Sequence, residues 1–128
     1  MAYEYEIDRS AGLVRVRSRG ATDYAAWEKT MRTVVRDPGF APGTPVLLDV
    51  RDQTTLPPPG ESARAAEGWR RLVPGSHVAI VAPPGGAAYG VVRQVSARSN
   101  GQVEAFTDPE EAVAWLRSSR EPAHPGDS

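Results

Sequence analysis

Two short, almost continuous apolar runs constrain the fold of this chain more than any other feature. They occupy residues 46–50 (VLLDV) and 77–82 (HVAIVA). Each run has the length of a strand, and turn-forming or charged residues follow it at once. A strand that is apolar on both faces belongs in the interior of a sheet that helices cover on both sides. The two runs therefore predict two central strands that lie side by side in an α/β sheet.

The N-terminal residues predict a β-hairpin. Residues 3–8 alternate large apolar side chains with acids, and residues 14–19 include valines that alternate with arginines. This period of two is typical of strands with one buried face. Because glutamates line one strand and arginines the other, we expect ion pairs across the hairpin.

Segments with helical periodicity lie between the remaining predicted strands. The pattern predicts a helix at 23–36 capped by Thr22, and a last strand at 103–106. The other helices are predicted at 61–72, at 87–98 and from 109 onward. The predicted fold class is therefore α/β, with a single mixed five-stranded sheet (an N-terminal antiparallel hairpin, then parallel strands) and about four helices. Residues 1–118 form the predicted domain, and the aperiodic residues 119–128 a disordered tail.

Composition excludes several classes of function. The 128 residues suit one domain, and the net charge of 15 − 16 = −1 gives no electrostatic basis for binding nucleic acid. The absence of cysteine excludes disulfides and thiolate chemistry. The N-terminus lacks the pattern of a signal peptide, and no apolar stretch approaches the length of a membrane span. We expect a cytoplasmic protein without stable membrane insertion.

Four motifs resemble the STAS domain superfamily, in particular its SpoIIAA-like (STAS/SEC14-type) branch of small bacterial proteins. The motifs are VLLDV (46–50), HVAIVAP (77–83), AYGVVRQV (88–95) and VEAFTDPEEAVAWL (103–116). The resemblance implies a mixed sheet with helices wound as a βα superhelix. It also implies a regulatory or ligand-binding role rather than catalysis.

The loop after residues 46–50 departs from the pattern of anti-anti-sigma regulators in this superfamily, which are phosphorylated in a D-S-S-G segment. When Asp49 is laid on the first Asp of their motif, Gly60 falls on the final glycine. The D-S-S positions are then occupied by Pro57, Pro58 and Pro59, so the usual phospho-acceptor serine is missing. Thr54, Thr55 and Ser62 are nearby hydroxyls that could substitute for it.

Three hypotheses about function follow. The first is a non-enzymatic binding or regulatory module whose partner, a protein or a small apolar ligand, binds the loop and the adjacent helix; its candidate residues are Asp49, Arg51, Asp52, Thr54, Thr55, Gly60, Ser62 and Tyr89. The second is a carrier of a small apolar or lipid-like ligand, because each of three predicted helices carries a tryptophan on its inward face: Trp27, Trp69 and Trp115. The third is an enzyme that uses Asp49 and Asp52 as acid and base.

Other chemistry has little support in the sequence. The only two histidines are His77, next to a buried strand, and His124, in the predicted tail, so a metal site lacks donors. Gly85–Gly86 open a helix but belong to no nucleotide-binding motif. We therefore expect no enzyme activity, metal or cofactor. A homodimer is a further expectation, should the helices leave one face of the central strands uncovered.

Overall fold

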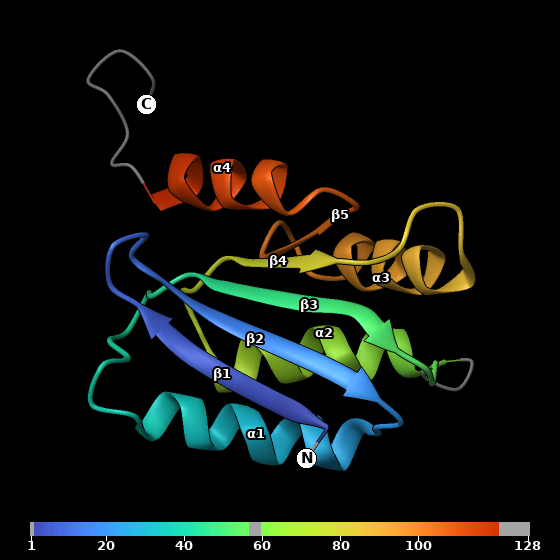
Figure 1. Cartoon of the computed structure of the whole chain (residues 1–128), viewed down its shortest axis with the longest axis horizontal. Coiled ribbons are helices and arrows are strands. Elements are labelled where there is room, and N and C mark those ends of the chain that lie inside the picture. The colour runs from blue at the N-terminus through green and yellow to red at the C-terminus, as the bar shows by residue number, and fades with distance from the viewer. Residues whose placement is uncertain (1, 57–59, 121–128) are drawn as a thin grey trace.

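A five-stranded mixed sheet forms the centre of the computed structural model, which describes residues 2–56 and 60–120 (Figure 1). The strand order is β1-β2-β3-β4-β5; β1 and β2 are antiparallel, and every other pair is parallel. The strands are β1 (Tyr3–Asp8), β2 (Leu13–Gly20), β3 (Val46–Gln53), β4 (Val78–Val81) and β5 (Val103–Phe106). The helices are α1 (Tyr24–Arg36), α2 (Glu61–Leu72), α3 (Ala87–Ala97) and α4 (Pro109–Arg120). The predicted fold class is confirmed.

The two apolar runs form the centre of the sheet, as predicted. Leu48 of β3 lies opposite Ile80 of β4, and each is at most 5% exposed. Leu47 and Val81 point to the opposite face and are equally buried. Since both faces are apolar, the two strands are stable only with helices on both sides.

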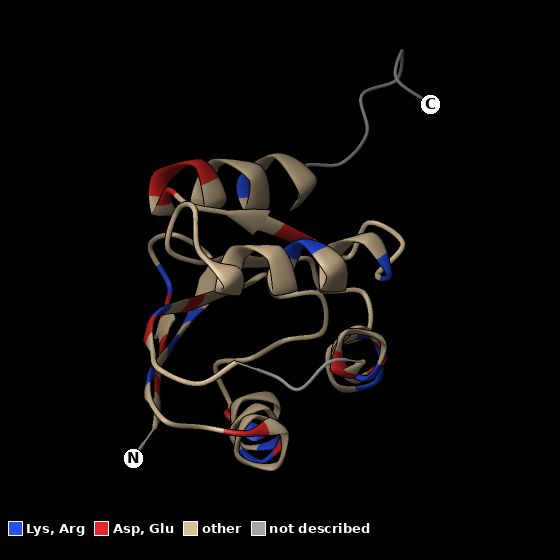
Figure 2. Cartoon of the chain, turned by 90° about the vertical axis from the view of Figure 1, so that its right-hand side faces the viewer, with Lys and Arg blue, Asp and Glu red and all other residues tan. Residues whose placement is uncertain are grey.

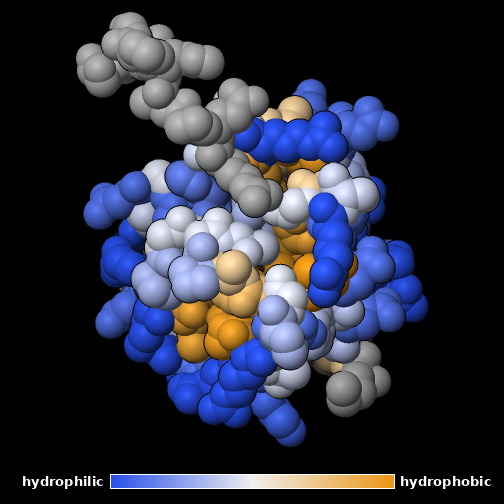
Figure 3. Space-filling view, turned by 90° about the vertical axis from the view of Figure 1, so that its left-hand side faces the viewer, coloured by the Kyte–Doolittle hydropathy of each residue, from blue (hydrophilic) through white to orange (hydrophobic). Residues whose placement is uncertain are grey.

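Helices α1, α2 and α3 cover one face and form the larger core (Figure 1). Trp27 of α1 and Trp69 of α2 meet there, with ring centroids 4.7 Å apart and an interplanar angle of 72°. Gly68 allows this close approach, because a Cβ at this position would lie 2.9 Å from the Trp27 ring. Some apolar side chains at the margin of this core are only half buried, among them Ile7 and Phe40. Figure 3 shows that apolar surface on the left-hand side of the molecule lies in recesses bordered by hydrophilic residues.

Helix α4 covers part of the other face, where it contacts β3, β4 and β5. The smaller core beneath it consists of Leu13, Leu47, Ala79, Val81, Ala112 and Leu116. The central strands are therefore covered on both faces by a single chain. A homodimer was expected only if one face of these strands were uncovered, and neither face is. Dimerisation therefore stays a prediction that the packing of the helices does not require.

The remainder of that face, over β1 and β2, carries charged side chains of both signs, because they alternate along these strands with the apolar side chains of the larger core. Figure 2 shows acidic and basic residues interleaved along the two strands. Arg19 pairs with Glu4 at 2.9 Å, and Arg15 pairs with Asp8 at 2.8 Å, which confirms ion pairs across the hairpin. Arg17 instead pairs with Asp52 of β3 at 2.8 Å. The arginine row of β2 thus links the hairpin to the central strand.

Several predicted boundaries were wrong by a few residues. Asp23, and not Thr22, caps α1, because its Oδ1 accepts a hydrogen bond from the amide of Ala26 at 2.8 Å. Strand β3 continues to Gln53, three residues past the apolar run, and α4 continues to Arg120, past the predicted domain boundary. Pro57, Pro58 and Pro59, which occupy the D-S-S positions, and residues 121–128 of the predicted tail lie outside the described residues.

A pair of glycine substitutions tests the packing of α1 against α2. We expect Gly68→Ala to lower the free energy of unfolding by about 1–3 kcal/mol, because the new methyl group would displace the Trp27 ring from its contact with Trp69. Gly90→Ala in α3 is the matched control: its Cβ would meet nothing within 4 Å, so we expect a gain of about 0.5–1 kcal/mol. Urea unfolding measures both, and equal effects of the two substitutions would contradict the close approach.

Candidate functional site

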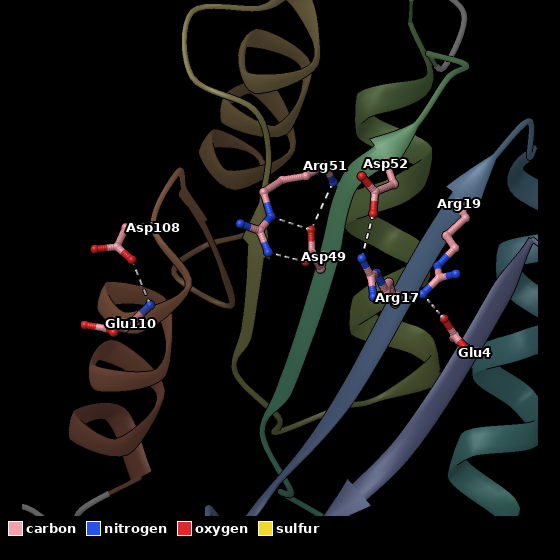
Figure 4. A network of polar contacts seen from close by, with 8 residues as sticks. All are labelled: Glu4, Arg17, Arg19, Asp49, Arg51, Asp52, Asp108 and Glu110. Atoms are coloured by element: carbon pink, nitrogen blue, oxygen red, sulfur yellow. Dashed lines mark hydrogen bonds and ion pairs between the residues drawn. The ribbon is translucent and has the colours of Figure 1, made fainter.

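A β-bulge shapes the carboxyl end of β3. Arg17 of β2 lies opposite Asp49, whereas Arg19 lies opposite Asp52, so Val50 and Arg51 together face Ser18. Two residues against one is the defining feature of a bulge, which bends the strand and redirects its side chains. Here Asp52 comes within 2.8 Å of Arg17, on the same charged face as the pair formed by Asp49 and Arg51 (Figure 4).

Asp49 and Arg51 form a bidentate ion pair. Nε and one terminal nitrogen of Arg51 donate to the two carboxylate oxygens at 3.0 and 2.7 Å, and the amide of Arg51 donates at 3.0 Å. Burial raises the pKa of the Asp49 carboxyl, but the hydrogen bonds from Arg51 and the charge of Arg17 outweigh burial and hold the pKa below its usual value. Asp49 therefore stays ionised at neutral pH.

Asp108 belongs to the electrostatic surroundings of Arg51, although it lies 57 residues further along the chain (108 − 51). The hydrogen bond to Asp49 raises the pKa of Arg51 most, and the charges of Asp52 and Asp108 raise it further. Asp108 also accepts a hydrogen bond from the amide of Glu110 at the start of α4. Nothing in the sequence connected Asp108 with Arg51; its position near Arg51 follows from the parallel order of β3, β4 and β5.

The segment after the bulge is held against the end of β2. The side chain of Gln53 accepts a hydrogen bond from Ser18 at 2.8 Å, and the amide of Thr54 donates to the carbonyl of Gly20 at 2.9 Å. Leu56 follows, and its side chain is 50% exposed. In the described part of the chain it is the one large apolar side chain that is exposed, and no pattern in the sequence pointed to it.

The structure distinguishes among the three candidate hydroxyls. Thr55 donates to the carbonyl of Thr22 at 2.9 Å and accepts from the amide of Thr22 at 3.0 Å. Ser62 is 7% exposed and donates to the side chain of Gln94 at 3.0 Å. Thr54 is exposed, and its hydroxyl has no hydrogen bond to any described residue. Of the three, Thr54 is therefore the hydroxyl most accessible to a modifying enzyme.

The other two predicted site residues have local roles. Gly60 precedes α2 with a φ of 89°, a left-handed conformation that favours glycine. Tyr89 of α3 is half buried against the larger core, with the guanidinium of Arg93 5.9 Å from its ring centroid. No contact described for Tyr89 joins it to Asp49, Arg51 or the segment that follows β3.

The described contacts give the carrier hypothesis no support. Trp27 and Trp69 are 7% and 2% exposed and fill the space between α1, α2 and the sheet by packing against each other. Trp115 lies on the opposite face, where its ring is perpendicular to that of His77 at 5.5 Å. Contacts of this kind between aromatic side chains are typical of core packing.

Two further features concern metals and membranes. Within residues 2–56 and 60–120, no group of three or more His, Asp or Glu side chains is arranged to hold a metal ion. None of the helices described there combines the length and the apolar character needed to cross a bilayer.

The fold resembles that of a solved structure. The chain superposes with a TM-score of 0.60 on an uncharacterised protein of the DUF3478 family, with a SpoIIAA-like fold, from Shewanella loihica PV-4. The match covers 90% of this chain and 92% of that chain at 17% sequence identity. The SpoIIAA-like fold that the motifs predict is therefore confirmed, whereas an identity this low carries no information about activity. No protein-family model and no curated protein matches the sequence.

The ion pair between Asp49 and Arg51 predicts a pH dependence of stability. A carboxyl whose pKa is lowered in the folded state stabilises the fold above its unfolded pKa, and this stabilisation is lost as the pH falls toward the folded pKa. We expect Asp49→Asn to lower the free energy of unfolding by about 0.5–1 kcal/mol at pH 7 and by less at pH 3. The control is Glu67→Gln, an exposed carboxyl of α2 without an ion pair to any described residue. Urea unfolding at both pH values checks the difference, and a loss that is larger at pH 3 would contradict this assignment.

Proposed function

We propose that this chain is a non-enzymatic, STAS-like binding module that recognises a protein partner through the surface at the carboxyl end of β3. We call it the β3 surface and define it by Asp49, Arg51, Asp52, Thr54 and Leu56. The observation that carries the proposal is the exposure of Leu56, at 50%, in the segment that follows the charged end of β3, four residues after Asp52. Protein–protein interfaces combine apolar side chains with polar ones in this way.

The charged side chains of the β3 surface are held in place before any partner binds. Arg51 is fixed by two hydrogen bonds to Asp49, and Asp52 by one from Arg17. Because these side chains are already ordered, they lose little conformational freedom on association. Arginine is also among the residues that contribute most to binding energy at interfaces. These features support a rigid recognition surface.

The same contacts favour binding over acid–base catalysis. Asp49 and Asp52 each pair with a different arginine. A general base or acid works best with a pKa near the working pH, whereas the pKa of Asp49 is lowered. The pairing of each carboxylate with an arginine therefore supports a non-enzymatic role.

Affinity capture with matched variants tests the proposal. The full chain is immobilised and exposed to a lysate of the cells that encode it, and bound proteins are quantified by mass spectrometry. We expect Leu56→Asp to reduce recovery of the specific partner about tenfold or more, since it replaces the exposed apolar side chain with a charge. Ala114→Asp adds the same charge on the exposed side of α4 and should leave recovery unchanged.

Arg51→Ala should weaken recovery as well, because it removes a charged side chain of the β3 surface and its ion pair with Asp49. Recovery of the same proteins at equal levels by Leu56→Asp and by the unmodified chain would contradict the proposal. So would turnover of any substrate that depends on Asp49 and Asp52.

A further inference from the structure

A cavity of about 500 Å³ lies away from the β3 surface, at the edge of the sheet where β4 and β5 begin. Its walls are the last turn of α2, the connection 74–77 into β4 and the connection 99–102 into β5. Binding sites for small molecules commonly have volumes of about 300–1,000 Å³. None of the functional hypotheses drawn from the sequence involves this part of the fold.

One side chain holds the walls of this cavity together. Nε2 of Gln102 lies 3.2 Å from the carbonyl oxygen of Trp69 and 3.1 Å from those of Val73 and Ser76. The two carbonyls near the end of α2 therefore have a donor and are not open ligands for a cation. The hydroxyl of Ser99 further ties the second connection by accepting from the amide of Val103 at 2.9 Å. The cavity is thus preformed.

The hydroxyl of Ser76 lacks a partner. Ser76 is 1% exposed, and its Oγ makes no hydrogen bond with any described residue. Its amide and carbonyl, in contrast, are bonded to Val73 and Gln102. A buried hydroxyl without a partner is unfavourable, so a native structure retains one where something else supplies the hydrogen bond. Because Ser76 lines the cavity, a ligand bound there is such a source.

The charge of the lining favours an anion. Arg70 reaches the cavity from α2, and neither Asp nor Glu is among the lining residues. In the part of the chain that the structure describes, Arg70 has no ion pair, whereas its neighbour Arg71 is paired with Glu28 at 2.8 Å. Asn100, whose side-chain amide can donate, belongs to the same lining. Arg70 is therefore the cation available to a ligand.

We propose that this cavity binds a small anionic molecule through a carboxylate or phosphate group. The guanidinium of Arg70 supplies the charge-assisted hydrogen bonds, the side chain of Asn100 donates beside it, and the hydroxyl of Ser76 gains the partner that it lacks. The proposal is independent of the β3 surface, since the two sites share no residue.

Titration of the full chain followed by two-dimensional ¹H–¹⁵N NMR tests this site. Inorganic phosphate and acetate are added in separate experiments at constant ionic strength and pH. We expect saturable shifts, for at least one of the two anions, in the amides of 75–77 and 99–102. A response to phosphate alone or to acetate alone identifies which of the two groups the site prefers.

Single substitutions distinguish binding of the anion in this cavity from a general effect of the charge of the protein. Arg70→Gln should weaken binding about tenfold, because a charge-assisted hydrogen bond is lost. Arg93→Gln makes the same change of charge on α3, outside the lining, and should leave binding within about twofold. Ser76→Ala should weaken binding without lowering the midpoint of thermal unfolding, since the unbound protein loses no hydrogen bond. Shifts that do not saturate for either anion, or equal weakening by Arg70→Gln and Arg93→Gln, would overturn the proposal.

Discussion

The parallel pairing of β3 with β4 is the interaction on which the rest of the structure depends. Leu48 and Ile80 lie side by side in the larger core, and Leu47 and Val81 lie beneath α4. Backbone polar groups buried this deeply have hydrogen-bond partners only within the sheet, so the two strands must stay paired. Because parallel strands end at a common edge, this pair also fixes where the chain emerges into the β3 surface. The SpoIIAA-like fold therefore positions that surface through its most buried element.

The sequence was sufficient for the order and type of the elements, because two apolar runs and the helical periods between them have few alternatives. It was not sufficient for the end of β3. The apolar run stops at Val50, yet the strand continues to Gln53, since hydrogen bonds from β2 and the ion pair with Arg17 replace burial as the reason for extended structure. Likewise Thr22 and Asp23 are both good caps, and only the backbone geometry decides in favour of Asp23.

The candidate site was predictable to a similar degree. Asp49, Arg51 and Asp52 could be named because they lie at the end of a buried run. Their two ion pairs depend on the bulge, and the position of a bulge depends on the register between strands, which the sequence of one strand does not reveal. Leu56 carried no signal, since a single leucine in a polar segment has no periodicity from which its burial could be predicted. The cavity beside Ser76 was beyond prediction for a different reason: it is formed by two connections distant in sequence and by a side-chain amide that joins them.

Native-state amide hydrogen exchange tests the central role of the β3–β4 pair most directly. The amides of residues 46–49 and 78–81 that bond within the sheet should exchange only through global unfolding, with an opening free energy equal to that measured by urea denaturation. If these amides opened locally, at a free energy well below that of global unfolding, the pair could not be the frame that positions either edge of the sheet.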